Sequence, residues 1–393
     1  MRIGIDARFY GPRCAGLGRY SEELVKHLAS LDQKNEYLVF LRPPEYAEFA
    51  IPANNFKKIL ANFAPYSLAE QLFFPFLIRR TKVDLMHFTH FNAPILYGGP
   101  FVVTIHDLIL KKFPTIRPGI TRRLKYFFKN LFYDFSLKLV AKKALKIIAV
   151  SRFTREDIKK ELKTPEAKIE VVYEGISSLS VGSASKERRD RILRKYGVKK
   201  PFFLYAGNSY PHKNLPFLLE GFEKLLEEKD FPENFQLVLV GKKDDFSRAL
   251  ENKFHRVCRE FPEAKRKFCT SVIFTGFVKD NELAALYQEA FLYIFPSLYE
   301  GFGFPGLEAM LFDLPVLSSR ASCLPEIFGP AACYFNPCDW KDFIEKSKLM
   351  VQDQFYRQKL ASLGRQQVKK FNWPEIAQKT LDIYKTVLPA LRD

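Results

Sequence analysis

The chain has 393 residues, of which 47% are hydrophobic and 27% are charged, and its formal net charge is +18. This length is enough for two domains that each bury a core, and the composition excludes a disordered or low-complexity protein. The charge favours an anionic partner without distinguishing among nucleic acid, an acidic membrane surface and a phosphorylated substrate.

The sequence predicts neither a signal peptide nor a membrane span. Its first residues, MRIGIDARFYG, have the pattern of a strand, and no apolar run approaches the ~20 residues of a spanning helix. The six cysteines lack C-x-x-C spacing, which predicts reduced thiols rather than a metal site. These features predict a cytoplasmic protein, and any membrane contact is expected to be peripheral.

In the first half of the chain, short apolar segments alternate with segments of helical period. Strands are predicted at residues 2–7, 37–41, 57–60, 83–87, 101–105, 146–150 and 169–172. Between the first strand and a helix at 21–30 lies a glycine-bearing loop, where the backbone at Gly16 and Gly18 could meet a diphosphate; a plain tight turn is the alternative. The alternation predicts a mainly parallel sheet with its ligand edge at the strand carboxyl ends.

Several histidines follow predicted strands. His106 and Asp107 come directly after the strand FVVTI, so they are expected at the ligand edge, where an imidazole can exchange protons; a surface histidine is the alternative. His87 and His90 resemble a metal pair. Because zinc needs three or four protein ligands and no third is evident, we interpret them as loop histidines.

Two segments combine cations with aromatic residues at helical spacing. Residues 121–146 contain eight Lys or Arg interleaved with Phe, Tyr and Leu, and residues 66–80 add a second run of this kind. Basic amphipathic helices dock on anionic bilayers. The alternative is a helix that packs on the core and directs its cations to solvent.

Residues 177–200 have the composition of a linker, after which the β/α pattern restarts. Strands are predicted at 202–206, 235–240, 272–276, 291–296 and 314–319, with helices at 214–229, 246–260, 281–290 and 305–312. We therefore predict domains at 1–178 and 179–372, and a C-terminal helix at 373–393 that crosses back to the first domain. Two such domains predict a ligand cleft between them.

The second domain supplies residues suited to a phosphate. The loop Glu300-Gly301-Phe302-Gly303 precedes a helix whose N-terminal N–H groups suit an anion, and Glu308 is expected in the first turn of that helix. Lys213 is placed to neutralise a phosphate, and residues 276–278 to cover a nucleobase. A solvated surface loop is the alternative for the two glutamates.

Taken in order, these motifs resemble those of the retaining glycosyltransferases of family 4. The most specific is the E-x7-E pair, Glu300 and Glu308. Supporting motifs are GIDAR at 4–8, AGLGRY at 15–20, HDL at 106–108, AVSRFT at 149–154, VVYEGI at 171–176 and PHKN at 211–214. The resemblance covers nearly the whole chain and implies the α/β GT-B fold, in which two doubly wound Rossmann-like domains face a central cleft.

The resemblance also implies roles. Glu308 would bind the ribose hydroxyls of a nucleotide sugar, Lys213 its diphosphate, and Glu300 its hexose, with His106 and Asp107 beside the transferred sugar and the incoming hydroxyl. Further donor contacts are implied for Gly16, Gly18, Arg19, Asn208, Phe277, Val278, Gly301, Phe302, Gly303 and Phe304. Neither a metal nor a cofactor is implied, because fixed donors can stabilise the departing diphosphate.

Two positions depart from the family pattern. Relatives often have an Arg near Asn208 as a second phosphate contact, so diphosphate binding is expected to depend more on Lys213 or Arg19. At Asp313 relatives usually have Gly, and Asp can adopt the left-handed conformation of a helix end at modest cost.

Several motifs, including PEIFGPAA at 325–332, are most similar to bacterial mannosyltransferases that build surface polysaccharides such as lipopolysaccharide from GDP-mannose. The resemblance implies transfer of mannose to a glycan or lipid-linked glycan acceptor, with the helix at 121–146 on the anionic inner face of the cytoplasmic membrane. The alternatives are a UDP-sugar-dependent transferase and another GT-B enzyme such as a phosphorylase or epimerase. Nucleic-acid binding is disfavoured because Phe and Tyr cluster in strands and on helical faces.

Overall fold

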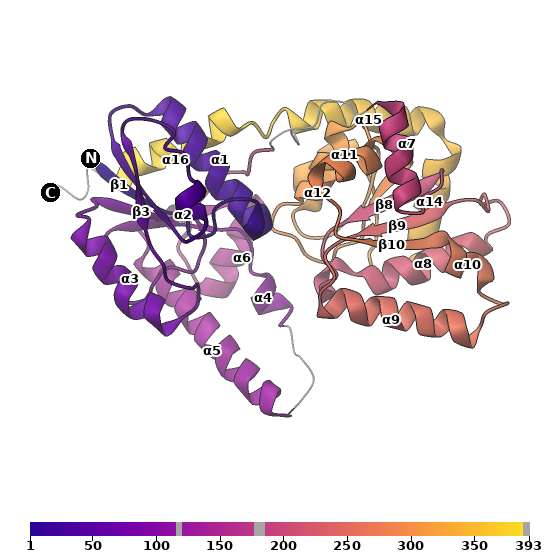
Figure 1. Cartoon of the computed structure of the whole chain (residues 1–393), viewed down its shortest axis with the longest axis horizontal. Helices are drawn as coiled ribbons and strands as arrows, with labels where there is room; N and C mark the ends of the chain where they lie inside the picture. The colour runs from indigo at the N-terminus through magenta and orange to yellow at the C-terminus, as the bar shows by residue number, and fades with distance from the viewer. Residues whose placement is uncertain (115–119, 177–184, 388–393) are drawn as a thin grey trace. The chain divides into compact units, whose positions relative to one another are not determined.

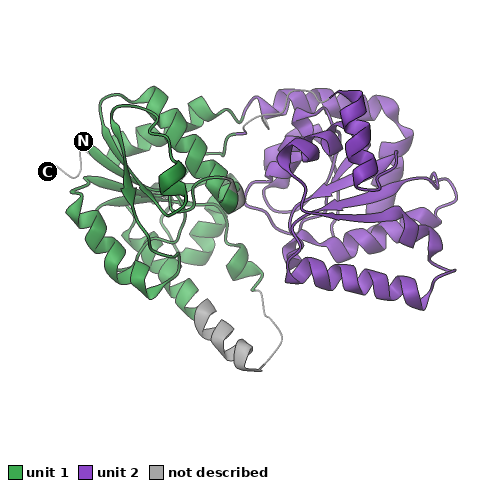
Figure 2. Cartoon of the chain, in the orientation of Figure 1, with its two compact units in different colours: residues 1–175, 371–393 green, residues 176–370 purple. Residues whose placement is uncertain are grey.

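The computed structural model describes residues 1–114, 120–176 and 185–387, without the side chains of Pro12, Ala15 and residues 120–130. The chain forms two compact units (Figure 2). Unit 1 comprises residues 1–175 and 371–393, and unit 2 comprises residues 176–370. The domain boundaries predicted from the sequence were 178/179 and 372/373.

Unit 1 contains a seven-stranded parallel sheet in the order β3-β2-β1-β4-β5-β6-β7 (Figure 1). Its strands are β1 (Arg2–Asp6), β2 (Glu36–Leu41), β3 (Phe56–Leu60), β4 (Leu85–Phe88), β5 (Phe101–Ile105), β6 (Lys146–Ala149) and β7 (Ile169–Val171). Its helices are α1 (Ala15–Leu31), α2 (Glu45–Glu48), α3 (Leu68–Arg80), α4 (Ile109–Lys112), α5 (Ile120–Lys143), α6 (Arg152–Leu162) and α16 (Trp373–Val387). The chain order reverses between β1 and β4, which makes this a doubly wound sheet.

Helices cover both faces of this sheet, which explains why strands such as β5 are continuous apolar runs. α1 and α16 share a core on one face, and α3, α5 and α6 share a core on the other. The C-terminal helix is fixed by Trp373, whose ring lies so close to Gly175 that an added Cβ would approach it to 2.5 Å. α16 is therefore an integral part of unit 1.

Unit 2 contains a six-stranded parallel sheet in the order β10-β9-β8-β11-β12-β13. Its strands are β8 (Phe202–Ala206), β9 (Gln236–Val240), β10 (Val272–Gly276), β11 (Leu292–Phe295), β12 (Val316–Ser319) and β13 (Ala332–Phe335). Its helices are α7 (Lys186–Lys195), α8 (Leu215–Glu227), α9 (Asp245–Glu260), α10 (Arg266–Ser271), α11 (Asp280–Glu289), α12 (Phe304–Leu311), α13 (Leu324–Phe328), α14 (Trp340–Gln352) and α15 (Gln354–Val368). Here the chain order reverses between β8 and β11, the point at which open α/β sheets bind ligands.

The predicted fold class is confirmed, and every predicted strand is present within two residues of its expected ends. Asp313 has the left-handed conformation expected of it, with φ of 58°. None of the helices in the described part of the chain is long and apolar enough to span a membrane. Of the residues at 121–146, those up to Lys143 form helix α5, and Lys146 begins β6. The side chains of the first half of α5, including Arg122, Arg123, Lys125 and Lys129, lie outside the described residues.

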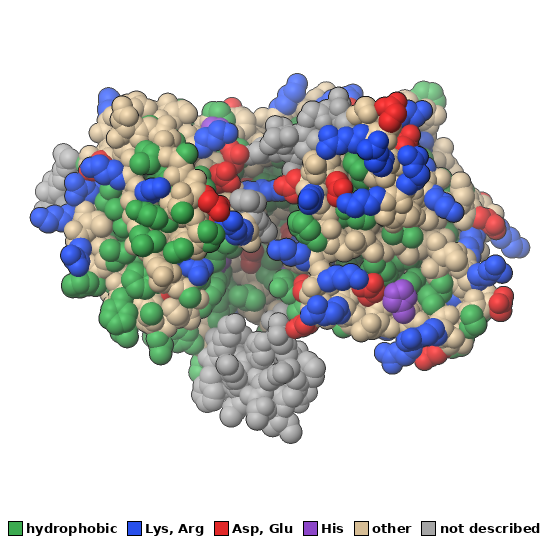
Figure 3. Space-filling model, in the orientation of Figure 1, with side chains coloured by type: hydrophobic (Ala, Val, Ile, Leu, Met, Phe, Trp, Pro, Cys, Tyr) green, Lys and Arg blue, Asp and Glu red, His purple; other side chains and the backbone are tan. Residues whose placement is uncertain are grey.

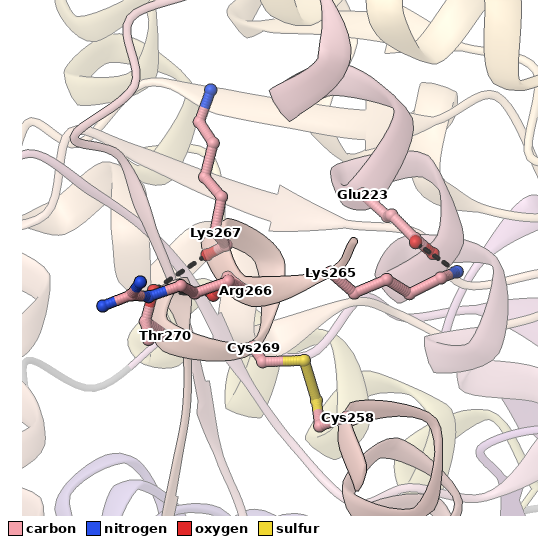
Figure 4. Close-up of a disulfide and its surroundings, with 7 residues drawn as sticks. All are labelled: Glu223, Cys258, Lys265, Arg266, Lys267, Cys269 and Thr270. Atoms are coloured by element: carbon pink, nitrogen blue, oxygen red, sulfur yellow. Dashed lines mark hydrogen bonds and ion pairs between the residues drawn. A yellow bond between two sulfur atoms is a disulfide. The ribbon is translucent and has the colours of Figure 1, made fainter. Parts of the chain in front are cut away.

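Three expectations were wrong. α1 begins at Ala15, so Gly16 and Gly18 lie in a helix rather than in a loop. His87 lies within β4, in agreement with the strand predicted at 83–87, so its interpretation as a loop histidine was wrong. Cys258 and Cys269, in α9 and α10, form a disulfide with a Cα–Cα distance of 5.8 Å (Figure 4), which the absence of C-x-x-C spacing did not predict.

Candidate active site

The loop between β11 and α12 presents the first glutamate of the E-x7-E pair. Gly303 ends the loop with φ of 106°, a conformation that favours glycine, and it immediately precedes α12. The loop residues Gly301 and Phe302 are buried, and the Sγ of Cys323 lies 3.2 Å from the carbonyl oxygen of Glu300. This packing fixes the backbone from which Glu300 and the N-terminus of α12 project.

Glu300 forms an ion pair with Lys213. The Lys213 Nζ lies 2.6 Å from Glu300 Oε1, and only 12% and 8% of the two side chains are exposed. The Ser297 hydroxyl donates to the same carboxylate oxygen at 2.6 Å, and Ser322 Oγ accepts from the Glu300 backbone N–H at 2.9 Å. Because β8 and β11 are neighbours at the reversal of the chain order, the loops that follow them bring these residues together.

The turn that bears Lys213 is held in place by its neighbours in the PHKN motif. Lys213 lies in a single 3₁₀ turn (Pro211–Lys213) rather than in the first turn of α8. Asn214 adopts the left-handed conformation, and its amide donates to the carbonyl oxygens of Pro296 and Pro337 at 3.2 and 2.9 Å. Burial and the Lys213 charge lower the pKa of His212 to about 4, so this ring is neutral. The motif thus anchors the lysine to the β11 loop.

Glu308 lies in the second turn of α12, not in the first turn as expected. It is 8% exposed, and the Tyr287 hydroxyl donates to its Oε2 at 3.2 Å. An added Cβ on Gly306, two residues earlier, would lie 2.3 Å from the Phe328 ring, so this glycine lets α12 pack closely on α13. Tight packing and the tyrosine together hold the carboxylate.

A small pocket opens at the carboxyl ends of β8, β9 and β10. Glycines at the ends of these three strands line it, together with Lys243 and Glu251, which form an ion pair of 3.4 Å. Close to it, Val278 is buried and the Phe277 ring is 63% exposed. Asn208, in the loop after β8, is partly buried, and its carbonyl oxygen accepts from the Tyr205 hydroxyl at 2.6 Å.

In unit 1, His106 is held from both sides. Its Nδ1 makes a short hydrogen bond with Glu174 Oε1, and its Nε2 lies 2.8 Å from the carbonyl oxygen of Thr89. Burial alone would lower the pKa of His106, but the Glu174 carboxylate and the Thr89 carbonyl outweigh it and raise the pKa. Both ring nitrogens face oxygen atoms, an arrangement that favours the protonated ring, which donates from both nitrogens.

Asp107 follows His106 and has a local structural contact. Its Oδ1 accepts from the backbone N–H of Ile109 at 2.9 Å at the start of α4. Arg19 is partly buried in α1. Gly18 is required by the fold itself, because an added Cβ would lie 1.8 Å from the Gly11 carbonyl oxygen. A Cβ on Gly16 would meet no described atom within 4 Å outside its own helix backbone and chain neighbours.

The GIDAR motif forms a buried charge cluster in unit 1. Arg8 has no exposed side-chain surface and lies 2.7 Å from Asp6 and 2.6 Å from Glu70. Its guanidinium stacks over Phe74, 4.1 Å from the ring centre. Burial opposes the charge of Arg8, but the two carboxylates outweigh burial and raise its pKa. The cluster lies at the carboxyl end of β1, where it supports the edge of the sheet.

His87 and His90 are both buried in unit 1. Burial and the nearby His106 charge lower the pKa of His87 to about 3, and its ring nitrogens lie 2.5 Å from the Tyr384 hydroxyl and 2.8 Å from Thr104 Oγ1. Burial also lowers the pKa of His90. Among the described residues, no group of three or more His, Cys, Asp or Glu is arranged to hold a metal ion.

Comparison with known families covers both units. Residues 15–178 match the model described as Glycosyltransferase Family 4, and residues 188–367 match the model described as Glycosyl transferases group 1. The chain is a family 4 glycosyltransferase. It thus belongs to a retaining hexosyltransferase family, and enzymes of this GT-B fold typically use nucleotide-sugar donors.

Three known proteins illustrate the similarity of this glycosyltransferase to others. It is 29% identical to O-antigen chain mannosyltransferase B of Escherichia coli over 94% of this chain and 96% of that protein. It is 27% identical to O-antigen chain mannosyltransferase RfbU of Salmonella typhimurium over 70% of this chain and 67% of that one. The structure of sucrose-phosphate synthase from Thermosynechococcus elongatus matches with a TM-score of 0.74 at 20% identity, over 99% of this chain and 100% of that chain, which confirms the fold.

The residues proposed from the sequence are thus divided between the units of this glycosyltransferase. Unit 1 contains Gly16, Gly18, Arg19, His106 and Asp107, and unit 2 contains the remainder. Sequence reasoning assigned no role to Glu174 or Ser297. Glu174 lies three residues after the end of β7, whereas His106 directly follows β5, so a rule that selects the residue directly after a strand does not select this glutamate.

Proposed function

We propose that this glycosyltransferase moves mannose from GDP-mannose to a glycan or lipid-linked glycan acceptor in the synthesis of a bacterial surface polysaccharide. The donor class is supported by the mannosyltransferases that match this chain over most of its length. The site is supported above all by the mostly buried pair of Lys213 and Glu300 at the β8–β11 reversal. An anionic ligand can replace the Glu300 carboxylate as the partner of Lys213.

In this proposal the second unit binds the donor. Lys213 and the backbone N–H groups at the start of α12 face the diphosphate, and Glu308, held by Tyr287, accepts from the ribose hydroxyls. Cleavage of the glycosidic bond leaves an additional negative charge on the departing nucleoside diphosphate. Lys213 lowers the barrier to this cleavage because its interaction with the departing diphosphate oxygen strengthens as negative charge develops there.

His106 has a positioning role in this proposal rather than a proton-transfer role. Its two ring nitrogens already donate to Glu174 and Thr89, so neither is free to accept a proton from the acceptor hydroxyl. The imidazolium instead fixes the turn after β5 and places Asp107 at the end of the strand. Glu300 would contact the hexose once the diphosphate has replaced it at Lys213.

A donor screen tests the proposal. The purified chain would be titrated with GDP-mannose, UDP-glucose and UDP-N-acetylglucosamine by calorimetry, and slow donor hydrolysis would be followed by mass spectrometry. We expect binding and release of α-mannose with GDP-mannose, and weakening of both in Lys213→Met. Preference for a UDP-sugar would overturn the mannose assignment but not the site, whereas equal donor binding by Lys213→Met would overturn the site.

A further inference from the structure

Helix α3 directs large apolar side chains away from the core as well as into it. Phe74 and Ile78 on its inner face are completely buried in unit 1. Its outer face exposes Leu68 by 80%, Leu72 by 57%, Phe73 by 58% and Phe76 by 62%. A helix that is apolar on all sides is normally enclosed by protein or lipid. The described part of the chain places nothing over this outer face.

Helix α5 continues the surface. Both helices pack on the same core, and Tyr133 of α5 and Tyr66, just before α3, both contact the ring of Phe91. In the described half of α5, the exposed large apolar residues are Leu131, Phe132 and Phe135, which are 59%, 50% and 58% exposed. We call these seven exposed residues of the two helices the α3–α5 face.

The face is large for a protein surface. An apolar side chain of this size offers roughly 150 to 250 Å² when free, so the four residues of α3 alone expose on the order of 400 Å². Apolar patches of that area usually mark an interaction site. Figure 3 shows hydrophobic side chains gathered over the α3 part of unit 1.

Cations border the apolar residues. Arg79 and Arg80 are exposed in the last turn of α3, and the Arg80 guanidinium lies 6.0 Å from the centre of the Phe76 ring. Lys138 and Lys142 are exposed on α5. Glu70 is the only acidic residue in α3 and it is buried, so the exposed charge of this helix is entirely positive.

We propose that the α3–α5 face docks the protein on an anionic lipid bilayer. Leu and Phe would enter the boundary between headgroups and acyl chains, while Arg79 and Arg80 contact lipid phosphates. A bilayer is favoured over a protein partner because the exposed charge of α3 is entirely positive and complements a negatively charged lipid surface. The argument depends on none of the residues assigned to the donor, so a failed donor screen would leave it standing.

Vesicle flotation with the full chain tests this proposal. We expect binding to vesicles that contain phosphatidylglycerol and much weaker binding to pure phosphatidylcholine. Phe73→Ser with Phe76→Ser should lower the bound-to-free ratio by about tenfold or more, and Arg79→Glu with Arg80→Glu should do so on anionic vesicles. Circular dichroism and thermal melting would check that the variants fold.

Two controls match these variants. Phe355→Ser removes a phenylalanine that is 85% exposed in unit 2, and Lys253→Glu with Arg256→Glu makes the same change in net charge on the exposed side of α9. Both should bind vesicles like the unmodified chain. Equal losses in test and control variants, or no binding by the unmodified chain, would overturn the proposal. A dimer detected by light scattering would also overturn the proposal if Phe73→Ser with Phe76→Ser dissociates it, because the α3–α5 face would then join two copies of the chain.

Discussion

The substitution Glu300→Gln separates two roles of the Glu300 carboxylate, as counter-ion of Lys213 and as the proposed contact of the hexose. Without donor, the carboxylate is the counter-ion of the lysine, at 2.6 Å and with little solvent access. A nucleoside diphosphate that binds to Lys213 must therefore replace an interaction that the protein already makes. The glutamine variant removes this competition while it keeps a side chain of similar shape.

The size of the effect follows from the contact. A hydrogen bond between charged groups contributes roughly 1.5–3 kcal/mol and one with a neutral acceptor about 1 kcal/mol, so the competition weakens by about 1 kcal/mol or more. GDP should then bind roughly fivefold more tightly. Turnover should fall, because the proposed contact with the hexose is lost in the transition state. The free energy of unfolding should fall by up to ~3 kcal/mol, because a mostly buried ammonium loses its partner.

Calorimetric titration with GDP, donor turnover and urea unfolding measure these three quantities. GDP should raise the melting temperature of Glu300→Gln more than that of the unmodified chain. Glu228→Gln is a matched control, since Glu228 pairs with Lys348 at 2.9 Å at a more exposed site of the same unit. Weaker GDP binding by Glu300→Gln would refute the competition, and an equal change in the control would show that the effect is not specific to the site.

Further predictions concern the supports of the site. Glu174→Gln should lower the free energy of unfolding by ~3 kcal/mol at pH 6. The loss of unfolding free energy should be smaller at pH 9, because the pKa of His106 is raised and its ion pair with Glu174 disappears as the pH rises through that pKa. Equal losses in urea unfolding at pH 6 and pH 9 would contradict this. His87 should make the free energy of unfolding fall by up to ~1.4 kcal/mol per pH unit as the pH drops from ~6.5 toward 4. In that range the unfolded chain protonates His87, whereas the folded chain, in which its pKa is about 3, does not. An unfolding free energy that does not change with pH would refute a neutral buried ring. Gly306→Ala should cost ~1–3 kcal/mol and weaken GDP binding, since its Cβ would collide with Phe328 and displace α12; calorimetry and urea unfolding would detect both effects. Reduction of the Cys258–Cys269 disulfide should lower the unfolding free energy by about 3 kcal/mol for the short loop that it closes, and an unchanged urea midpoint would argue against the bond.

The strands could be predicted from the sequence because helices cover both faces of a parallel sheet. Such strands are continuous apolar runs, of which FVVTI in β5 is typical. β13 was missed because ACYF is only four residues long and begins with alanine, which does not favour strands, although Gly-Pro and Asn-Pro pairs flank it. The first turn of α1 was missed because two glycines disfavour a helix locally, whereas the close approach of Gly18 to Gly11 requires one of them.

The exposure of α3 could not be predicted for a different reason. Its sequence is apolar around the whole helix, so the pattern does not show which side faces the core. The structure decides this, because Phe74 and Ile78 pack on the sheet and the neighbouring Phe73 and Phe76 do not. The pairing of His87 with Tyr384 is similarly inaccessible, since 297 residues separate them.

The contact between Lys213 and Glu300 shows why the site is a property of the topology. The two residues are 87 positions apart, and no spacing rule relates them. They meet because β11 pairs with β8 and not with β10, the strand that precedes it in the chain. The loops that follow β8 and β11 therefore lie side by side. A sequence can identify the residues that follow each strand, but which of them touch depends on the strand order. The competition between the Glu300 carboxylate and a diphosphate for Lys213 therefore cannot be predicted from the two residues separately, because it depends on the strand order.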